Sequence, residues 1–569
     1  MKKFTFGTPE KLVPSAFCDG FDYCETACSF DEKFFSFRAL SKGCVLEFPM
    51  DENTRVYGFG LQLNRFEHFG SKVTLRCNAD PVTPSGETHA PVPFFVTDKG
   101  YGIYVDTARY AEFYCGRQKV ASPETESGSY TPELDVEKLY SADRSGNKLM
   151  SIFIPVAKGI DIYVIEGKTI TDIVSQYNML SGGGCLVPEW ALGVLYRCNG
   201  TYNDRQILDI ARHMRENDVP CDIIGIEPGW QTHAYSCTYK WNPERFPNPK
   251  EFIDELRGMD YHINLWEHAF VHPDSPVYDK LLAYSGDYTV WGGLVPDFGK
   301  PEARKIFSDY QYENLVALGV DGFKADECDG SDLTGGWSFP NHTEFPSGLD
   351  GEQYHNLFGV LYTKTLLETL RGTPTLSECR SMGALAASYP FVLYSDLYDH
   401  RAFVRGTAVS GFSGLLWSPE LRGTASKEEL IRRVQAIVFS AQCLVNAWNY
   451  DGIPWTVFDC EDEVKELFKL RKALVPELVE AFRLYHEKGI PPVRALVMDF
   501  TDDENVKETD DEYMFCGNML VAPIIANTGD EREVYLPEGE WTDFYTGERV
   551  QSGRFTVNTK NIPVYRKIG

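Results

Sequence analysis

The sequence contains no run of 18 apolar residues, so it offers no candidate for a membrane-spanning helix. The first residues, MKKFTFGTPEKLVPSAF, include two lysines but lack the apolar core of a signal peptide, so we expect a cytoplasmic protein. Basic residues are outnumbered by acidic ones, and the net charge is −28. This balance argues against nucleic acid and anionic membranes as partners, because both bind basic patches.

Several familiar motifs are also missing. The 15 cysteines are odd in number and never spaced as CxxC, so we expect reduced, mostly buried thiols and no disulfide framework. The chain has no HExxH, calcium-loop, GxSxG, GxGxxG or P-loop pattern. His268 and His272 are four residues apart but run into Pro273, so a helix presenting both to a metal is not expected. We therefore expect neither a metal nor a cofactor.

The length and the apolar content point to several domains. With 569 residues and 43% hydrophobic residues, the chain can build two to four cores. Residues 1–184 read as short strands rich in aromatic and β-branched residues, such as SKVTLRCNAD and GYGIYVDTA, and they end in a glycine-rich linker. Residues 490–569 return to strand patterns, such as REVYLPEGEW.

Between these two parts, apolar strand candidates alternate with helices. Examples of strands are CDIIGIEPGW, HINLWEHAF, GVDGFKAD and GFSGLLWSPE, and one of the helices is SKEELIRRVQAIVFSAQCLV, with Ser426 and Glu429 as its capping pair. Repeated β–α units of this kind predict a (β/α)8 barrel. The predicted architecture is multidomain α/β plus β: an N-terminal β-sandwich (1–184), a central (β/α)8 TIM barrel (185–489) and a small C-terminal β-sandwich (490–569).

The barrel strand candidates end in polar or aromatic residues. In a (β/α)8 barrel the active site lies at the carboxyl ends of the strands. Strand alternation places Lys324 and Asp326 on one face and Glu327 on the other. The residues at these strand ends are Glu227, Trp230, Trp266, Glu267, His268, Lys324, Asp326, Glu327, Glu378, Arg380, Asp396, Trp417 and Glu420.

This mixture of acids and aromatic side chains fits a sugar site. Aromatic rings pack on the C–H faces of sugars, and two carboxylates flanking a glycosidic bond are the minimum for its hydrolysis. Asp326 is the candidate nucleophile, and Lys324 on the same face would favour its ionised form. Taken alone, such an acid cluster is also compatible with a solvated loop or a cation site.

Several segments resemble glycoside hydrolase family 31, whose members are retaining α-glycosidases built on a β-sandwich, a (β/α)8 barrel and C-terminal β domains. DGFKAD is similar to the nucleophile strand of that family, and CRSMGALAASYPFVLYSD is similar to the segment with a substrate-binding arginine and the acid/base aspartate. VYGFGLQ resembles part of the N-terminal domain, whose loops reach the active site, and NMLVAPII and VYLPEGEWTDFYTG resemble the proximal C-terminal domain. The resemblance covers nearly the whole chain, and the distal C-terminal domain of the family is not recognised.

The resemblance implies roles for individual residues. Asp326 corresponds to the nucleophile and Asp396 to the acid/base, with Asp399 or Glu420 as the alternative proton donor. Arg380 would bind the sugar near its 2-hydroxyl, Glu227 would bind hydroxyls on the far side of the ring, and the sugar would lie between two tryptophan walls. The full set of expected substrate-binding residues is Glu227, Trp230, Trp266, Glu267, His268, Lys324, Cys328, Arg380 and Trp417.

The departures from the family bear on the substrate. YSDLYDHRAF and WSPELRG stand where α-glucosidases usually have a Gly-Asp-Asn loop and an Asp-Ile-Gly-Gly-Phe run. These segments, with Cys328 and Trp417, are similar to a divergent branch that includes bacterial α-galactosidases, although packing in the core also explains both residues. We therefore expect an exo-acting retaining α-galactosidase that acts on oligosaccharides or other α-glycosides. An α-glucosidase or α-xylosidase is the alternative, a non-catalytic sugar-binding protein is the rival from another class, and the sequence leaves homo-oligomer formation open.

The mechanism makes a geometric prediction. Retaining carboxylate pairs stand about 5–6 Å apart, and inverting pairs stand about 6.5–9.5 Å apart. We expect the shorter spacing between Asp326 and Asp396 in a pocket closed at one end. We also expect the pKa of Asp396 to be raised by a dry aromatic setting that includes Tyr394 or Tyr398.

Overall fold

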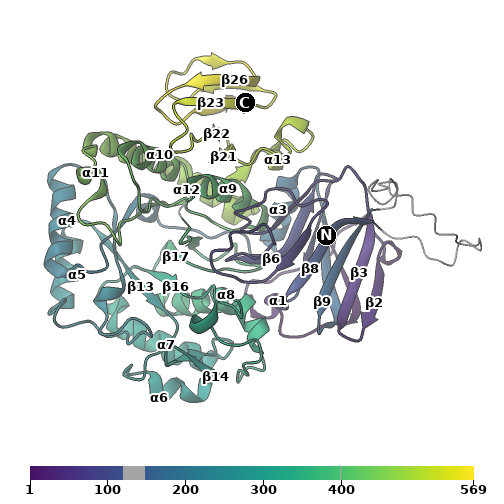
Figure 1. Cartoon of the computed structure of the whole chain (residues 1–569), viewed down its shortest axis with the longest axis horizontal. Helices are drawn as coiled ribbons and strands as arrows, with labels where there is room; N and C mark the ends of the chain where they lie inside the picture. The colour runs from purple at the N-terminus through teal and green to yellow at the C-terminus, as the bar shows by residue number, and fades with distance from the viewer. Residues whose placement is uncertain (119–147, 398, 569) are drawn as a thin grey trace, which may run out of the picture.

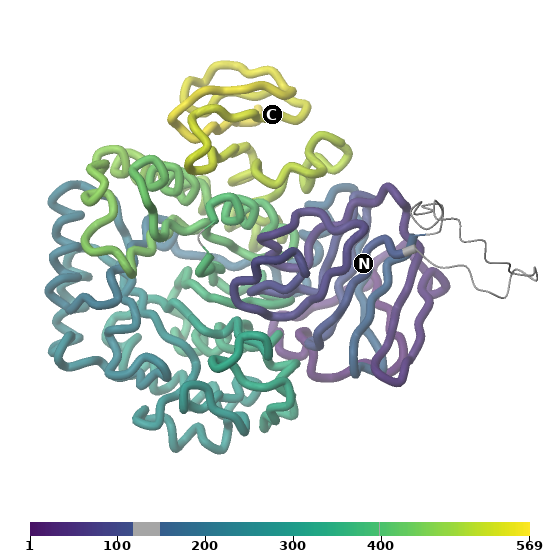
Figure 2. Tube along the Cα trace, in the orientation of Figure 1, coloured from purple at the N-terminus to yellow at the C-terminus, as the bar shows by residue number. Residues whose placement is uncertain are grey.

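The computed structural model describes residues 1–118, 148–397 and 399–568. In Figure 1 the N-terminal strands, drawn in purple, lie to one side of a central barrel, and the C-terminal strands, drawn in yellow, lie on another side. The tube in Figure 2 follows the chain through these three parts in order.

The N-terminal part contains two five-stranded antiparallel sheets in the described residues. Alternation along the strands divides their side chains between two cores: Phe95 packs between the two sheets, whereas the adjacent Phe94 stacks on Tyr177 of helix α3 (Ile170–Met179) with ring centroids 4.0 Å apart. One sheet has the order β1 (Lys2–Thr8), β10 (Lys158–Glu166), β7 (Tyr101–Val105), β6 (Pro91–Thr97), β4 (Val56–Gly60). The other has the order β2 (Ser36–Leu40), β3 (Gly43–Met50), β9 (Lys148–Pro155), β8 (Ala111–Gln118), β5 (Lys72–Leu75).

The central part is a ring of parallel strands. Seven of them pair in the order β18 (Phe391–Leu393), β17 (Ser377–Cys379), β16 (Gly322–Asp326), β13 (His262–His268), β12 (Ile223–Ile226), β11 (Val194–Arg197), β19 (Cys443–Asn446). Residues 415–421 occupy the eighth position: Trp417 forms a parallel bridge with Leu393 of β18, and Leu421 forms one with Val445 of β19. The ring is therefore closed, and its carboxyl ends form one rim, which we call the barrel rim.

Helices cover the outside of the ring. They are α4 (Asp204–Glu216), α5 (Pro249–Gly258), α7 (Pro301–Asn314), α8 (Gly351–Leu370), α9 (His400–Ser410), α10 (Lys427–Val438) and α12 (Glu461–Lys488). Capping side chains fix where several of them begin; for example, Asp350 and Gln353 form a capping box at the start of α8. The residue at which each helix begins therefore fixes the length of the loop that precedes it at the rim.

The predicted helix beginning at Ser426 is shorter than expected. Ser426 caps α10 by accepting a bond from the Glu429 N–H, but the helix ends at Val438, and Cys443 to Asn446 form strand β19. The predicted strand GFSGLLWSPE also differs, because its first residues form the short helix η8 (Gly411–Ser413). In both segments the apolar side chains are buried, and burial alone does not distinguish a helix from a strand.

A hairpin, β14 (Ser285–Val290) and β15 (Gly293–Pro296), projects between β13 and α7. Its two-residue turn has positive φ at Trp291 (49°) and at Gly292 (70°), which is the geometry of the tight hairpin turns. A tryptophan in this backbone region is unusual and strained. The turn fixes the position of the Trp291 ring near the rim.

The C-terminal part pairs strands in the order β20 (Val493–Ala495), β21 (Tyr513–Phe515), β22 (Met519–Val521), β27 (Val564–Ile568), β24 (Glu540–Asp543), β25 (Arg549–Val550), with a separate pair β23 (Glu531–Leu536) and β26 (Gly553–Asn558). Its contacts with the barrel include the ion pair of Arg566 with Glu477 on α12. Among the described helices, none is both long and apolar enough to cross a bilayer. All 15 cysteines are unpaired, and most of them are buried, as expected.

Candidate active site

Beneath the rim, the barrel interior is filled by polar side chains. Arg197 of β11 is fully buried and forms ion pairs with Glu227 after β12 and with Glu378 of β17. Its Nη1 also donates to Asn264 Oδ1 at 2.7 Å. Burial raises the pKa of Glu378 to about 7, although Arg197 opposes this rise. This layer closes the barrel from below, so a ligand reaches the site from the rim.

Asp326, the last residue of β16, is held through both carboxylate oxygens. The indole N–H of Trp266 donates to Oδ2 at 2.6 Å, and the backbone N–H of Glu327 donates to Oδ1 at 2.9 Å. The residue is 8% exposed, so the carboxylate is accessible only from one side. A buried carboxylate with two fixed donors is oriented in the way that a nucleophile requires.

Arg380, directly after β17, connects the rim acids. Its guanidinium binds Asp329 (Nε to Oδ2, 3.0 Å), Asp80 (Nη2 to Oδ2, 3.1 Å) and Asp396 through Nη1, and its Nε lies 3.9 Å from Asp326 Oδ1. Asp326 and Asp396 therefore lie against the same guanidinium, and paired glycosidase carboxylates have to lie close together. The expected spacing of about 5–6 Å stays a prediction.

Asp396 lies in a more open position, with half of its side chain exposed. It forms ion pairs with Arg380 and Arg422. Although burial acts against them, these two guanidinium groups hold the pKa of the Asp396 carboxyl well below its usual range. The expectation of a raised pKa is therefore corrected, because two cations outweigh the aromatic surroundings. Tyr398, one of the two tyrosines expected there, lies outside the described residues.

Lys324 does not pair with Asp326, as its place on the same face had suggested. Its ammonium lies 3.3 Å from Glu227 Oε1 and 4.9 Å above the centre of the Tyr394 ring. Burial, together with the charge of Asp326, raises the pKa of the Tyr394 phenol well above its ordinary value. Glu227, Lys324 and Tyr394 thus pack together beside Arg380, whose guanidinium lies 5.7 Å from the centre of the Tyr394 ring.

Aromatic rings extend from Asp326 outward over the rim. Tyr235 lies 5.5 Å from Trp266 and makes an edge contact of 5.0 Å with Trp291, which is parallel to Trp337 at 6.3 Å. Tyr235 is 46% exposed, and Trp291 and Trp337 are half-buried. We call Tyr235, Trp291 and Trp337 the aromatic group; it offers flat surfaces next to the buried carboxylate.

His268 lies next to Tyr235 and Trp291 of the aromatic group and is fully buried. Its Nδ1 accepts the backbone N–H of Phe270 at 3.1 Å, and its ring lies 5.4 Å from both Trp266 and Trp291. Burial lowers its pKa to about 3, so the imidazole is neutral. Its predicted role in substrate binding stays a prediction.

Four residues expected to bind substrate are buried elsewhere. Trp230 is 0% exposed and donates its indole N–H to the Trp266 carbonyl at 2.6 Å, and Trp417 is 1% exposed and donates to the Phe403 carbonyl at 3.0 Å. Glu267 faces the helix layer, where it accepts bonds from Tyr362 and Gln311. Cys328 is 0% exposed within the core. Trp230, Trp417 and Glu267 use their polar atoms in bonds within the protein, and Cys328 is covered by the core, so their roles in substrate binding stay predictions.

The two alternative proton donors also have other partners. Asp399 caps helix α9 by accepting the Ala402 N–H at 2.8 Å. Glu420 is fully buried, where burial raises its pKa to about 7; it lies 3.3 Å from Arg422 and accepts a bond from Asn446. Asp396 is the more exposed carboxylate on Arg380 and faces the rim.

Several residues of the site were not anticipated. Arg422 follows Glu420 by two positions, and the sequence LRG around it contains no motif that predicts a role for this arginine. Asp80 belongs to the N-terminal part, so its contact with Arg380 depends on how two domains pack. Tyr235 and Trp291 lie in loops, where neither a period nor a motif predicts which way a ring points.

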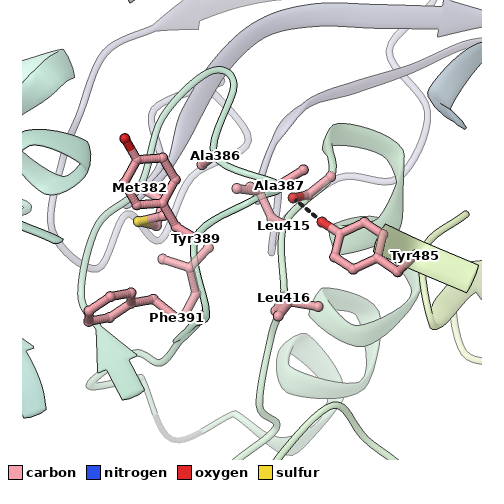
Figure 3. A pocket seen from close by; sticks show the side chains of 10 residues that line it. Met382, Ala386, Ala387, Tyr389, Phe391, Leu415, Leu416 and Tyr485 are labelled. Atoms are coloured by element: carbon pink, nitrogen blue, oxygen red, sulfur yellow. Dashed lines mark hydrogen bonds between the residues drawn. The ribbon is translucent and has the colours of Figure 1, made fainter. Parts of the chain in front are cut away.

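A further hollow is separate from this site. Figure 3 shows it between the loop that follows β17, with Met382 and Tyr389, and Tyr485 of α12, whose hydroxyl donates to the Gly414 carbonyl at 2.9 Å. It has no space for a water molecule. The hollow is a packing gap in the core and not a ligand site.

A closed (β/α)8 ring with paired carboxylates at its rim is a recurrent architecture of glycoside hydrolases. Residues 184–481 match the glycosyl hydrolases family 31 TIM-barrel domain, and residues 489–569 match the C-terminal domain of the same family. The chain belongs to glycosyl hydrolase family 31.

The chain is similar to characterised members of this family. It is 26% identical to alpha-xylosidase XylQ of Lactiplantibacillus pentosus, over 89% of this chain and 66% of XylQ. It is 24% identical to alpha-glucosidase 2 of Bacillus thermoamyloliquefaciens, over 91% of this chain and 67% of that protein. The chain thus spans about two thirds of the length of these curated relatives. Its fold is similar to that of the GH31 dextranase of Flavobacterium johnsoniae, with a TM-score of 0.80, 21% identity, and coverage of 95% of this chain and 68% of the dextranase.

Proposed function

We propose that the protein is an exo-acting, retaining α-glycosidase that hydrolyses α-xylosides or α-glucosides. The observation that carries this proposal is the placement of Asp326 and Asp396 against one guanidinium, that of Arg380, at the barrel rim. One carboxylate is buried and oriented, and the other is open to solvent. These are the positions that a nucleophile and an acid/base require.

In the first step, Asp326 attacks the anomeric carbon, and the bond to the leaving oxygen breaks as Asp396 protonates it. In the second step, Asp396 removes a proton from water, which attacks the same carbon and releases Asp326. Before substrate binds, Arg380 and Arg422 keep Asp396 ionised. Hydroxyl groups of the bound sugar therefore have to take over contacts of Arg380, so that Asp396 can carry a proton.

The closed floor supports action on a terminal sugar. Arg197 and Tyr394 are both buried beneath the rim, so a chain cannot pass through the site. Glu227 and Lys324 bind the hydroxyls farthest from the scissile bond, and the aromatic group faces the leaving side. This arrangement is suited to a single sugar ring with its leaving group directed outward.

Substrate preference is a separate part of the proposal. The curated relatives described above are named for xylosides and glucosides, which favours these sugars over the α-galactoside expected from the divergent segments. Initial rates on nitrophenyl α-xyloside, α-glucoside and α-galactoside test it. A preference of at least about tenfold for the xyloside or the glucoside is expected, which is about 1.4 kcal/mol in the transition state. A preference for the galactoside would instead identify the protein as an α-galactosidase.

The nucleophile is tested with Asp326→Ala. We expect kcat to fall by at least about three orders of magnitude. With an α-glycosyl fluoride as substrate, added azide fills the vacated space, attacks from the β face and gives a β-glycosyl azide. Near-normal turnover without azide would remove Asp326 from the mechanism.

The acid/base is tested with a matched pair. Asp396→Asn removes the proton donor, so turnover of a nitrophenyl glycoside slows by about 100-fold or more, and azide then yields an α-glycosyl azide. Asp399→Asn is the control, because asparagine also caps helices and the variant should fold normally and keep its activity. Slow turnover in Asp399→Asn together with normal turnover in Asp396→Asn would identify Asp399 as the proton donor. Proton NMR should show the α-anomer as the first product of the wild-type enzyme.

A further inference from the structure

Glu327 follows the nucleophile in an unusual conformation. Its φ of 55° places a residue with a full side chain in the left-handed region, which is strained and concentrated at functional sites. This backbone turn ends the strand alternation that would have directed Glu327 away from Asp326. Instead the half-buried carboxyl lies where the charges of Asp326, Arg380, Asp329 and Asp396 act on it.

Too few cations surround Glu327 to balance the negative charge of another ionised carboxylate. Arg380 already binds Asp80, Asp329 and Asp396 and lies near Asp326. In the part of the chain that the structure describes, the Glu327 backbone N–H bonds to Asp326, and no ion pair holds its side chain. Like charges at short range disfavour ionisation. Burial and the charge of Asp326 accordingly raise the pKa of Glu327 well above its ordinary value.

We propose that Glu327 is a substrate-binding residue that remains protonated and donates a hydrogen bond from its carboxyl O–H to a hydroxyl oxygen of the sugar held at Asp326. Three observations support the assignment: the left-handed backbone, the backbone N–H of Glu327 that binds Oδ1 of the nucleophile, and the saturation of Arg380 by other acids. A neutral carboxyl can donate where a carboxylate only accepts. The groups around Glu327 are Asp326, Asp329, Arg380, Asp396, Tyr235 and Cys237.

This inference rests on the proposed glycosidase function, and its test is separable from that function. The probe is the α-glycosyl fluoride of the sugar preferred in the nitrophenyl panel. Fluoride leaves without a proton, so Asp396 contributes no alkaline limb to kcat/KM in the first step. A remaining alkaline limb reports a group that must be protonated to bind the sugar.

Wild-type enzyme should lose kcat/KM on the fluoride as pH rises through the raised pKa of Glu327. Glu327→Gln keeps a donor that cannot ionise, so its kcat/KM should stay within about threefold of wild type at low pH and show no alkaline limb. Glu327→Ala removes the donor and should lose about 10- to 100-fold at every pH. Glu512→Gln is the control, since Glu512 is also a buried carboxyl with a raised pKa but lies in the C-terminal part. It should leave the profile unchanged.

The same alkaline limb in wild type and Glu327→Gln would overturn the inference, as would full activity of Glu327→Ala. If wild-type enzyme released no fluoride from any α-glycosyl fluoride, the proposed function would fail and this inference would fail with it. An active wild type with an unchanged limb in Glu327→Gln would overturn the role of Glu327 alone.

Discussion

At the scale of single residues, partners decide which carboxyl groups are charged. Asp396 lies beside two arginines and is held ionised, whereas Glu267 lies in the helix layer with only the hydroxyl of Tyr362 and the amide of Gln311. Burial raises the pKa of Glu267 to about 8, and the two hydrogen bonds oppose this rise only in part. Two carboxyl groups at strand ends of the same barrel therefore differ in charge because they face different surroundings.

Glu267 makes the stability depend on pH. Because its folded pKa of about 8 exceeds the ordinary value of 4.5, the native state binds a proton that the unfolded state releases between these values. The free energy of unfolding therefore falls as pH rises through this range. Glu267→Gln cannot ionise, so from pH 6 to pH 9 its Tm should fall by about a few degrees less than that of wild type. Thermal unfolding at both pH values measures the difference, and equal falls in both proteins would show that Glu267 is already ionised when folded.

At the scale of elements, one hairpin supplies part of the site. The tight turn between β14 and β15 holds Trp291 against Tyr235, next to the indole that binds Asp326. This surface lies on the leaving side of the proposed site. Its flat rings are suited to packing against a second sugar ring.

Trp291→Ala tests this surface by comparing two substrates. On a disaccharide, kcat/KM should fall by about tenfold or more, because the lost stacking contact is worth about 1–2 kcal/mol. On the glycosyl fluoride, which has no second ring, the rate should change by less than about threefold. Tyr288→Ala is the matched control: Tyr288 lies on the same hairpin, is 39% exposed and bonds to His342 instead. Equal losses on both substrates would indicate that Trp291 only supports the fold of the site.

At the scale of the whole molecule, the active site depends on domain packing. Asp80 of the N-terminal part lies 3.1 Å from Arg380, accepts the Ser395 hydroxyl at 3.0 Å and accepts the Asp396 N–H at 3.3 Å. The pKa of Asp80 is held far below its usual range because Arg380 and His89 outweigh its burial. The N-terminal domain thereby helps to set the position of Asp396, the proposed acid/base.

Asp80→Ala should lower kcat/KM by about 10- to 100-fold, since Arg380 and Asp396 lose a fixed neighbour and small misplacements at a reacting centre slow catalysis strongly. The comparison is Asp98→Ala, which breaks another contact between domains, the 2.9 Å ion pair with Lys507, far from the rim. Asp98→Ala should lower Tm and leave kcat/KM within about twofold. If the two variants lowered Tm equally and neither affected kcat/KM, Asp80 would have only a structural role.

The sequence by itself determined the class of fold and indicated candidates for the reacting residues. Alternating strand and helix patterns predicted a barrel between two β-rich parts, because buried positions appear in the sequence as a periodic pattern of apolar residues. Asp326, Arg380 and Asp396 were located because each lies at or after the carboxyl end of a strand, and parallel strands bring these ends to one rim. The divergent segments gave a less reliable guide to the sugar, since substrate preference depends on the shape of the whole pocket.

Only the tertiary structure decided which of the candidate side chains face the site. Trp230 and Trp417 come at strand ends but turn into the core, and Asp80 and Tyr235 reach the rim from loops. The tertiary structure also sets the partners of the charged groups. Lys324 forms an ion pair with Glu227, and two neighbouring arginines lower the pKa of Asp396 and keep it ionised. The physical reason is that Coulomb and desolvation energies depend on distances of a few ångströms across the fold, and spacing along the chain does not encode those distances.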